Sequence, residues 1–446
     1  MDNKQLLARV KEDEVKFISL QFTDVTGTVK SVDIPVMRLE GALKDGVWFD
    51  GSSVEGFARI QESDMRLLPD TDTYAVLPWT LPELRRARIF CEIYQPDGKP
   101  FPGDPRGALK NLLVKLKERG WKYNVGPEPE FFLFRGGNNL ESIHPVPHDV
   151  GGYFDFSAND DAVRVRTELM DALEGMGLDV ETGHHEVALG QHEIDFRFDD
   201  ALHTADNVLT LKYTVKAIAA QHGLIASFMP KPIFGINGSG MHVHQSLCDM
   251  QGKNLFSDPK DEFHLSAIAY HFIAGQLAHA RALAAVVAPT VNSYKRLVPG
   301  YEAPVYIGWA QINRSALIRI PRWSEGRDES TRAELRFPDP ASNPYLAFTA
   351  MLAAALDGID RKLECPKPLN QVNVYELTPE ERKSLGVAEL PGSLGEALHE
   401  LAGDAVIKDS LGAIIFEAFE RAKREEIEEY QMKVTDWEVE RYLERA

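Results

Sequence analysis

The sequence predicts an α+β protein in which a small strand-rich domain precedes a larger domain of mixed helices and strands. Short strand signals alternate with turns at the start of the chain, and residues 94–107 are dense in proline and glycine, as is typical of a domain boundary. Beyond that segment, helical periods alternate with further strands. We therefore expect one domain over residues 1–103 and a second over residues 104–446, with a helical C-terminal tail.

Within the first domain, residues 15–24 (VKFISLQFTD) and 25–35 (VTGTVKSVDIP) predict the two strands of a hairpin. Residues 46–57 (GVWFDGSSVEGF) are rich in glycine and serine and too polar for a core, so we expect a loop there. The second domain should hold helices at about residues 105–119, 160–176, 204–222, 264–288 and 340–363.

The C-terminal segment, residues 412–446, has the pattern of an amphipathic helix and ends in a stripe of Trp, Val, Tyr and Leu. Such a stripe packs either on the helix's own domain or against another subunit. Both alternatives are consistent with the sequence.

The charge balance excludes one class of partner. Lys plus Arg number 49 against 68 Asp plus Glu, a formal net charge of -19, whereas a nucleic-acid partner requires a basic surface. The N-terminus is charged, and the most apolar segment, residues 266–289, is interrupted by histidine and arginine, so we expect a cytoplasmic protein without a membrane span. The three cysteines, Cys91, Cys248 and Cys365, have neither zinc-site spacing nor the density of a disulfide framework.

Residues 126–134 (GPEPEFFLF) place two carboxylates at the start of an apolar strand. Successive side chains of a strand point to opposite faces, so Glu128 and Glu130 should share one face while Pro129 and Phe131 take the other. Two like charges that close repel, and something positive must lie between them. Pro129 removes a ladder hydrogen bond, which predicts an edge position or a bulge.

The same alternation recurs in three further segments, HEIDFRF, RAELRF and GMHVHQSL. Their polar faces carry Glu193, Asp195, Arg197, Arg332, Glu334, Arg336, His242, His244 and Ser246. For any one strand, the solvated face of an antiparallel sheet would alternate in the same way. A solvated face usually carries Lys, Thr and Ser, whereas these faces carry Glu, His and Arg almost exclusively. We therefore expect one sheet with a charged front face and helices packed behind it.

Carboxylates accompanied by one or two imidazoles are typical ligands of Mg²⁺ or Mn²⁺. Glu186, in HHEVALGQHE, adds to this set, so the candidate ligands number more than one ion requires. A pair of divalent ions would also remove the repulsion between Glu128 and Glu130.

A run of arginines follows along the chain: Arg296, Arg314, Arg319, Arg332 and Arg336. Guanidinium groups bind carboxylate and phosphate oxygens bidentately, and together with carboxylate-held divalent ions they indicate phosphoryl transfer. No GxxxxGK[ST] loop occurs, and the glycines of GINGSGMH do not form a dinucleotide fingerprint. A nucleotide would therefore be held on the sheet, and the NGSG glycines would form a tight turn between strands.

Several of these segments resemble, in order and spacing, those of type I glutamine synthetase. They are FDGSSVEGF, GPEPEFFLF, NGSGMHVHQSL, KRLVPGYEAP, NRSALIRIP and RAELRFPDPASNPYLA. The short subtype, which is not regulated by adenylylation, is the more similar one. The resemblance implies a small β-grasp-like N-terminal domain and a catalytic domain built on a curved antiparallel sheet with flanking helices. It also implies a dodecamer of two hexameric rings, with each active site between adjacent subunits.

The resemblance further implies two groups of metal ligands. The ligands of the ion nearer glutamate would be Glu130, Glu186 and Glu193. The ligands of the ion nearer the nucleotide phosphates would be Glu128, His242 and Glu334. The implied cofactors are two or more Mg²⁺ or Mn²⁺ ions per site, with ATP as co-substrate.

Substrate and nucleotide contacts are implied at matching positions. Those for glutamate and ammonium would be Ser53, Asn237, Gly238, Arg296, Glu302, Arg314 and Arg336. Those for the nucleotide would be Glu181, His244, Ser246, Arg314 and Arg319. The catalytic residues would be Asp50, Glu302 and Arg314, with Asp50 lent by a neighbouring subunit and Glu302 carried on a mobile flap.

Three positions concern regulation or depart from the family pattern. Glu329 stands where some members carry a nucleotide-binding lysine. Tyr375 aligns with the tyrosine that long-subtype enzymes adenylylate, although a tyrosine in a surface turn is common. Arg59 matches an arginine of feedback inhibition by glutamine, or is an ordinary exposed arginine. A regulatory protein partner is also consistent with the family.

The implied activity is the ATP-dependent amidation of L-glutamate by ammonium through γ-glutamyl phosphate, in nitrogen metabolism. A ligase for polyamines or other amines is one rival, and the small anionic pocket of Asp50, Ser53 and Glu302 favours ammonium over it. A catalytically silent relative is the other rival. The complete set of carboxylates argues against silence, because buried like charges destabilise a protein without metal.

Overall fold

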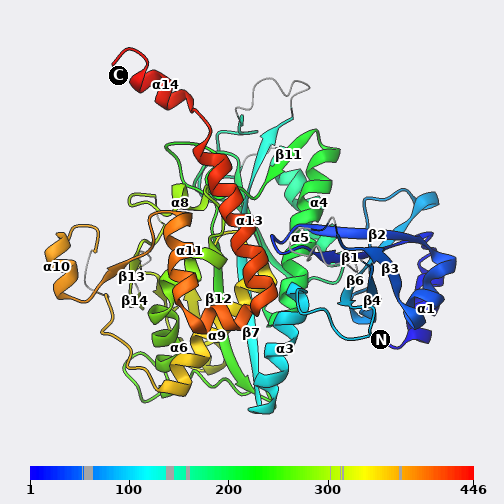
Figure 1. Ribbon diagram of the computed structural model, residues 1–446, viewed down its shortest axis with the longest axis horizontal. Coiled ribbons are helices and arrows are strands. Elements are labelled where there is room, and N and C mark those ends of the chain that lie inside the picture. The colour runs from blue at the N-terminus through cyan, green and yellow to red at the C-terminus, as the bar shows by residue number, and fades with distance from the viewer. Residues whose placement is uncertain are drawn as a thin grey trace.

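The computed structural model describes residues 1–52, 54, 64–136, 145–156, 161–301, 303–311, 313, 316–370 and 374–445. A small N-terminal unit lies beside a larger unit that contains the rest of the chain (Figure 1). In the described part of the chain, no helix is both long and apolar enough to cross a membrane.

The N-terminal unit is a six-stranded sheet in the order β2-β1-β6-β4-β3, with β5 paired to β6. Its strands are β1 (Phe17–Thr23), β2 (Val29–Pro35), β3 (Val47–Asp50), β4 (Asp64–Pro69), β5 (Ala75–Val76) and β6 (Arg86–Tyr94). The predicted hairpin is confirmed, since β1 pairs antiparallel with β2. The prediction of a loop over residues 46–57 is wrong at Val47–Asp50. These residues form β3, which pairs with β4 and turns Phe49 inward.

Two helices, α1 (Asn3–Glu12) and α2 (Leu39–Asp45), complete the N-terminal unit. Asp2 accepts the N–H of Gln5 and the Gln5 side chain accepts the N–H of Asp2, a reciprocal cap that begins α1. The apolar side of α1, with Leu6 and Val10, packs into the core of the unit with the buried residues of β1 and β6.

The larger unit is built on a nine-stranded sheet in the order β14-β15-β16-β12-β7-β9-β8, with β10 and β11 also paired to β7. Its strands are β7 (Trp121–Arg135), β8 (Val180–His185), β9 (Gln191–Phe196), β10 (Asp199–Asp200), β11 (Leu224–Ser227), β12 (Met241–Asp249), β14 (Trp309–Ala310), β15 (Ile318–Arg319) and β16 (Ala333–Leu335). The pairs are antiparallel except β14 with β15. A separate pair joins β13 (Tyr306–Ile307) to β17 (Ala388–Glu389).

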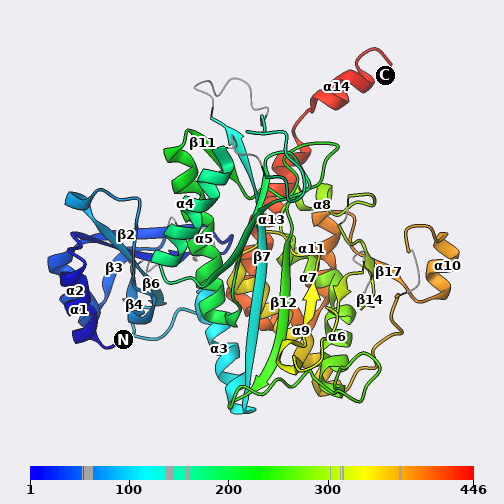
Figure 2. The same cartoon turned by 180° about the vertical axis from the view of Figure 1, so that it is seen from behind.

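Helices surround this sheet, and the long strands β7 and β12 run side by side through the middle of the unit (Figure 2). The helices are α3 (Pro105–Glu118), α4 (Asp161–Gly175), α5 (Ala201–Gln221), α6 (Ala267–Ala278), α7 (Ala280–Val287), α8 (Ser293–Arg296), α9 (Pro344–Arg361), α10 (Pro379–Ser384), α11 (Leu394–Gly403), α12 (Ala405–Leu411), α13 (Ala413–Gln431) and α14 (Asp436–Tyr442). All the predicted helices are present, but the one expected at 264–288 is divided at His279 into α6 and α7.

The expected arrangement of the four polar-faced strands is confirmed. The strands β16, β12, β7 and β9 are consecutive neighbours in the sheet. Their inward residues, among them Val243, Phe131 and Ile194, belong to one buried core with helices α5 and α9. Arg197 is an exception, because β9 ends at Phe196 and the Arg197 side chain is exposed beside Asp179.

Pro129 lies in a central strand of the sheet, but only one side of the strand is paired at this position. The strand β12 pairs with β7 through Pro129. On the other side of β7, β10 pairs as far as Val125 and β9 pairs only from Glu130, so in the described structure residues 126–129 face no strand there. A missing N–H is tolerated at such a gap, which acts as a local edge.

The two units touch through polar contacts. Arg88 of β6 donates to Thr210 Oγ1 at 2.9 Å, and Asn343, before α9, donates to the carbonyl of Asp24 at 3.2 Å. The chain crosses between the units from Tyr94, the end of β6, to Pro105, the start of α3. The division at residue 103 stays a prediction.

The C-terminal helices differ in how they pack. In α13, Ile415, Phe416 and Phe419 are buried in the core of the larger unit. In α14 no residue is buried, Trp437 is 61% exposed, and the helix projects beyond the rest of the molecule (Figures 1 and 2). The first part of the predicted amphipathic tail therefore packs on its own unit, while the terminal stripe does not.

Candidate active site

Cross-strand pairing gathers the predicted carboxylates and imidazoles on one face of the sheet. His242 of β12 lies opposite Glu128 of β7, and Glu130 of β7 lies opposite Glu193 of β9. His244 of β12 lies opposite Glu334 of β16. Directly opposed residues of neighbouring strands point to the same face. The charged front face predicted from alternation is thus present.

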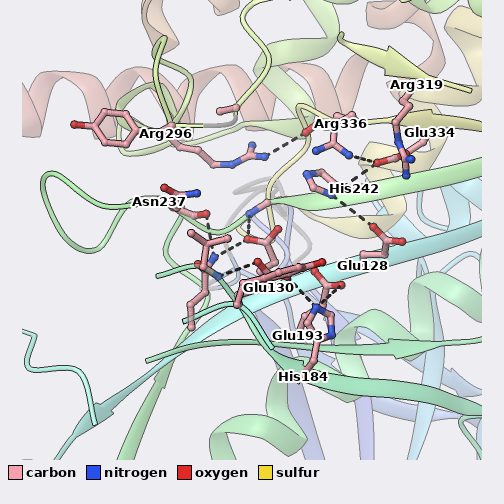
Figure 3. Close-up of a pocket in the computed structure, with 18 residues that line it drawn as sticks. Glu128, Glu130, His184, Glu193, Asn237, His242, Arg296, Arg319, Glu334 and Arg336 are labelled. Carbon is pink, nitrogen blue, oxygen red and sulfur yellow. Dashed lines mark hydrogen bonds and ion pairs between the residues drawn. The ribbon is translucent and has the colours of Figure 1, made fainter. Parts of the chain in front are cut away.

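This face forms the floor of a cavity of about 330 Å³. All six candidate metal ligands line it: Glu128, Glu130, Glu186, Glu193, His242 and Glu334. The arginines Arg296, Arg319 and Arg336 line it as well, and in Figure 3 they lie across the cavity from Glu130, Glu193 and His184. Asn237 and Gly238 complete the predicted substrate contacts that the described residues contain.

A second cavity, of about 260 Å³, adjoins the first and shares Glu128 with it. The predicted nucleotide contacts Glu181, His244 and Ser246 line this second cavity, as does Glu329. The aromatic ring of Phe198 also faces it. One sheet therefore carries two adjoining polar cavities, with Glu128 at their boundary.

Five residues singled out from the sequence cannot be assigned to these cavities from the described part of the chain. Ser53, Glu302, Arg314 and Arg59 lie outside the described residues. Asp50 ends β3 in the N-terminal unit, where its carboxylate accepts the N–H of Ser52 at 2.8 Å, and it lines neither cavity of its own chain.

Opposite charges hold the part of the floor around Glu128 and Glu334. His244 Nε2 lies 2.8 Å from Glu128 Oε1, and His242 Nδ1 lies 3.5 Å from Glu128 Oε2. Burial raises the pKa of Glu128, but its hydrogen bonds with the two histidines outweigh burial and hold that pKa well below the usual range. Glu334 pairs with both Arg319 and Arg336. Burial raises the pKa of Glu334, but the charges of Arg336 and of the nearby histidines and Arg319 together lower it.

In the part of the floor around Glu130, Glu186 and Glu193, the neighbouring charges are alike. Burial and then the charge of Glu186 raise the pKa of Glu130, and burial and then Glu130 raise the pKa of Glu193. His184 Nε2 is 3.0 Å from Glu186 Oε1 and 3.9 Å from Glu193 Oε1. Glu130 and Glu193 are buried and Glu186 is half-buried beside them, so the three carboxylates repel one another when ionised.

This donor set fits divalent cations that prefer oxygen ligands. Ligand atoms of Glu128, His244 and Glu334 lie within 4.8 Å of one another, and so do those of His184, Glu193 and Asp195. A cation among Glu130, Glu186 and Glu193 would neutralise the charges that raise their pKa values. His244 thus joins the first group beside the predicted His242, whose Nδ1 lies 3.5 Å from Glu128 Oε2 and 3.9 Å from Glu334 Oε1.

Both glycines of the NGSG segment, Gly238 and Gly240, stand where a side chain would collide with neighbouring atoms. A Cβ on Gly240 would lie 2.5 Å from Arg296 Nη2, and a Cβ on Gly238 would lie 2.1 Å from the carbonyl oxygen of Pro230. Arg296 is itself fixed by donating to the carbonyls of Arg336, Phe337 and Pro338. Gly240 therefore lets the backbone approach the buried guanidinium, and Gly238 lets it approach the Pro230 backbone, beyond the turn that the sequence predicts.

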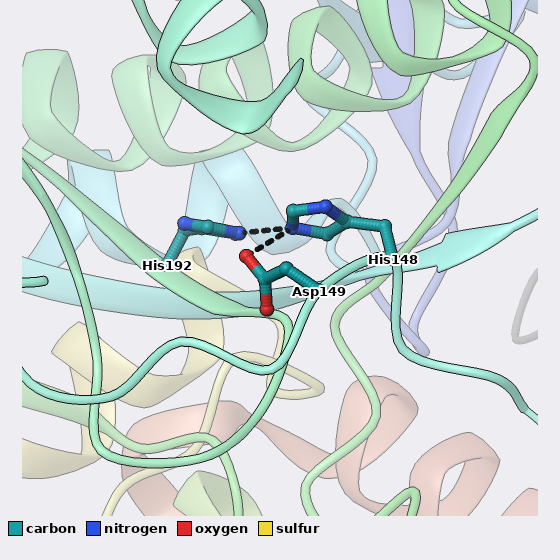
Figure 4. A group of neighbouring side chains, drawn as sticks. All are labelled: His148, Asp149 and His192. Carbon is teal, nitrogen blue, oxygen red and sulfur yellow. Dashed lines mark hydrogen bonds and ion pairs between the residues drawn. The ribbon is translucent and has the colours of Figure 1, made fainter. Parts of the chain in front are cut away.

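A second histidine cluster lies behind β9 (Figure 4). His148 Nε2 is 2.8 Å from His192 Nε2 and 2.9 Å from Asp149 Oδ2. Arg166 Nη1 is 2.8 Å from His192 Nδ1. A guanidinium can only donate, so His192 Nδ1 accepts and its proton stays on Nε2. A protonated Nε2 cannot bind a metal, and we assign this cluster to hydrogen bonding.

The cluster supports the loop between β8 and β9. Asp149 Oδ1 accepts the N–H of Gly190 at 2.8 Å, and Asp149 Oδ2 lies 3.1 Å from His185 Nε2. His185 Nδ1 is in turn 2.7 Å from the carbonyl of Glu186. The group thus ties down both ends of the loop that carries Glu186 to the first cavity.

Several cavity residues were not predicted from the sequence. Each of them lines the first or the second cavity: Tyr153, His184, Gln191, Tyr301, Asn124, Asp195, Phe198 and Arg332. Asp195 and Arg332 were recognised only as members of polar strand faces. His184 had an available signal, because it stands beside His185 in a strand and pairs opposite Glu193.

Comparison with known proteins agrees with this architecture. Residues 14–96 match the family described as the glutamine synthetase beta-Grasp domain, and residues 102–442 match the glutamine synthetase catalytic domain. The chain is 52% identical over 438 residues to a glutamine synthetase of Thermotoga maritima, covering 97% of this chain and 98% of that protein. It is 50% identical over 446 residues to one of Halobacterium salinarum, covering 100% and 97%.

Solved structures are also similar. The structure titled "GmaS/ADP complex-Conformation 1" superposes with a TM-score of 0.89 at 33% identity, covering 98% of this chain and 99% of that one. The β-grasp unit, the catalytic sheet with its carboxylate and arginine cavity, and full-length identity near one half all lead to the same assignment. The chain belongs to the glutamine synthetase family.

Proposed function

We propose that this protein joins ammonium to the γ-carboxyl group of L-glutamate, with ATP converted to ADP and phosphate, and so forms L-glutamine. The observation that carries the proposal is the pair of adjoining cavities on one sheet, which share Glu128. Phosphoryl transfer needs the nucleotide and its acceptor in line and close together, and two adjoining cavities suit that need.

Glutamate would occupy the first cavity. The buried guanidinium groups of Arg296 and Arg336 would bind its carboxylates, and the backbone at Asn237 and Gly238 would fix its other end. ATP would occupy the second cavity, with Phe198, Ser246 and His244 near the nucleoside. Its phosphates would point across Glu128 toward Arg319, which lines the first cavity.

The residues also fit divalent ions, either Mg²⁺ or Mn²⁺. The glutamate-side group would be Glu130, Glu186 and Glu193, and the nucleotide-side group would be Glu128, Glu334 and one or both of His242 and His244. Bound ions would offset negative charge on the phosphates and on the developing transition state.

A carboxylate is a poor acyl donor because its oxygen does not leave. Phosphorylation of the γ-carboxylate gives γ-glutamyl phosphate, whose leaving group is phosphate. Arg336 and Arg319, both anchored on Glu334, are placed to stabilise charge on the transferring group. Ammonium then has to lose a proton before it can attack the acyl phosphate.

The groups that take this proton would be Asp50 and Glu302, with Ser53 beside them and Arg314 near the phosphates. Asp50 lies in the N-terminal unit and lines neither of the two cavities described above. We infer that a neighbouring subunit supplies it, in a dodecamer of two hexameric rings. Support for an assembly comes from α14, whose apolar residues are not covered by the described chain.

The local structure bears on two further positions, Tyr375 and Glu329. Tyr375 is half-buried and lies 3.1 Å from the carbonyl of Ala303, which lines the first cavity, so adenylylation there is not proposed. Glu329 lines the second cavity in place of a lysine, and we propose that Arg332, which donates to His244, supplies the positive charge.

A direct assay tests the function. Purified protein with ATP, Mg²⁺ and glutamate should release phosphate when ammonium is added, and glutamine should accumulate in equal amount. Phosphate release with methylamine or a polyamine but not with ammonium would establish a different amine ligase. Absence of phosphate release with every amine tested would point to a catalytically silent relative.

A further inference from the structure

Gln191 is a buried residue that joins three parts of the first cavity. It is the first residue of β9, and only 1% of its surface is exposed. Its Nε2 donates to Glu130 Oε2 at 2.6 Å and to the carbonyl of Gly238 at 3.1 Å. Its Oε1 accepts the N–H of Ala188 at 3.2 Å. Strand β7, the loop before β12 and the loop after Glu186 therefore meet at one amide.

The orientation of this amide is determined by its partners. Glu130 Oε2 also accepts the N–H of Gly240, the Gly238 carbonyl can only accept, and the Ala188 N–H can only donate. Reversing the amide would place Oε1 against two oxygens and the NH₂ group against an N–H. One orientation thus satisfies both amide hydrogens and the carbonyl oxygen of a side chain that is almost fully buried.

The contact also selects which oxygen of Glu130 is free. The Gly240 N–H donates to the same atom, Glu130 Oε2, at 3.0 Å. Both donors therefore hold Oε2, and Oε1 remains available to a ligand in the cavity. A carboxylate held at one oxygen by two donors has its rotation fixed before a ligand arrives.

We propose that Gln191 is a positioning residue that orients Glu130 toward a divalent cation and holds the Gly238 segment in place for glutamate. This rests on the proposed function for the identity of the substrate, but not for the cation. Among the described residues, no other side chain makes all of these contacts with the three segments.

The test replaces Gln191 by methionine, which keeps the length of the side chain and removes its hydrogen bonds. Titration of the chelator-treated protein with Mn²⁺ alone, followed by calorimetry, should show roughly tenfold weaker binding at the affected ion, the usual effect of losing a residue that orients a ligand. The KM for glutamate should rise about tenfold as well, while the KM for ATP stays within about twofold.

Gln276→Met is a matched control. Gln276 is also fully buried, and its amide donates to Gln245 Oε1 and the carbonyl of Met351, but it lines neither cavity. It should lose stability without any change in Mn²⁺ affinity or in the KM for glutamate. Equal losses of Mn²⁺ affinity in both variants would show that Gln191 acts only through general stability, and would overturn the assignment.

A second variant covers the case in which methionine does not fold. Gln191→Glu keeps the shape but puts an oxygen where the two N–H groups were, so it should also raise the KM for glutamate. Wild-type Mn²⁺ affinity in a folded variant of either kind would overturn the proposal. The Mn²⁺ titration needs no turnover, so its result is independent of which amine the enzyme uses.

Discussion

Glu128 and Glu130 stand two residues apart on one face of β7, and their surroundings give them opposite acid–base behaviour. Two imidazoles hold the pKa of Glu128 well below the usual range, although burial opposes this. Burial and the charge of Glu186 raise the pKa of Glu130. Glu128 is thus stable as a carboxylate in the protein alone, whereas Glu130 gains most from a cation.

Glu130→Gln should therefore separate stability from metal binding. In chelator at neutral pH the variant should unfold at a higher temperature than wild type, because Glu130, ionised in the unfolded chain, must take up a proton or keep a buried charge on folding, and glutamine does neither. Its Mn²⁺ affinity should fall roughly 10–100-fold. Thermal unfolding and calorimetry measure the two effects.

Glu128→Gln is the contrasting variant for that experiment. It removes a carboxylate that two histidines stabilise, so its unfolding temperature in chelator should fall. If both variants shifted the unfolding temperature in the same direction, the opposite pKa directions of the two glutamates would be wrong.

His279 predicts a pH dependence of stability. Its Nδ1 lies 2.6 Å from Asp404 Oδ2 and its Nε2 lies 3.1 Å from Asp357 Oδ2. Burial lowers its pKa, but the hydrogen bonds to the two carboxylates outweigh burial and raise it. The charged ring therefore stabilises the fold fully below the ordinary histidine pKa, and that contribution is lost as pH rises through the raised value.

His279→Gln should destabilise the protein by about 2 kcal/mol at low pH, the range of hydrogen bonds to charged groups. The difference from wild type should shrink as the pH rises above neutrality. Urea unfolding at several pH values measures it. A difference that grew with pH would mean that the ring is neutral in the fold.

At the scale of elements, the junction between the two units depends on close backbone contact. Gly27, in the β1–β2 turn, has φ +86°, and a Cβ there would lie 2.8 Å from Asn343 Cα. Asn343 caps α9 by accepting the N–H of Tyr345 and also donates to the carbonyls of Asp24 and Val25. One residue thus begins a helix and holds the neighbouring unit.

Gly27→Ala should therefore lower stability by about 1–3 kcal/mol, from backbone strain and overpacking together. Gly120→Ala is the matched control, since Gly120 has φ +76° and open space around its Cβ position. It should show the strain alone. Equal losses in urea unfolding would mean that the turn can move away from Asn343 without a penalty.

At the scale of the whole molecule, α14 is the segment least supported by its own chain. It has no buried residue, whereas α13 before it contributes to the core. Exposed Trp437, Tyr442 and Leu443 form an apolar surface of the kind that a second subunit covers.

Truncation after Gln431 should therefore change assembly more than folding. Far-ultraviolet circular dichroism should show a folded chain, while gel filtration should show a smaller particle than the full-length protein. An unchanged elution volume would exclude α14 from the subunit contacts.

Features that depend on residues close together in the sequence could be predicted from the sequence alone. Alternation with a period of two is local, so the shared face of Glu128 and Glu130, and of His242 and His244, followed from the residues alone. The approximate positions of helices such as α3 and α9 followed from helical periodicity. The family motifs then extended these observations to a set of ligands that one cavity does contain.

Other features required the fold. The tolerance of Pro129 comes from a gap between β10 and β9, and the role of Gln191 comes from three segments that meet far from one another in sequence. The strand at β3 was missed because its pairing with β4 overrode a glycine- and serine-rich composition.

The sequence by itself thus determined the fold class, the polar strand faces and the family, because these depend on local periodicity and on ordered motifs. Only the tertiary structure decided which carboxylates are stabilised as anions and which repel one another, and which amide orients them. Those properties depend on burial and on the charges within a few ångströms, and the chain brings such neighbours together only when it folds.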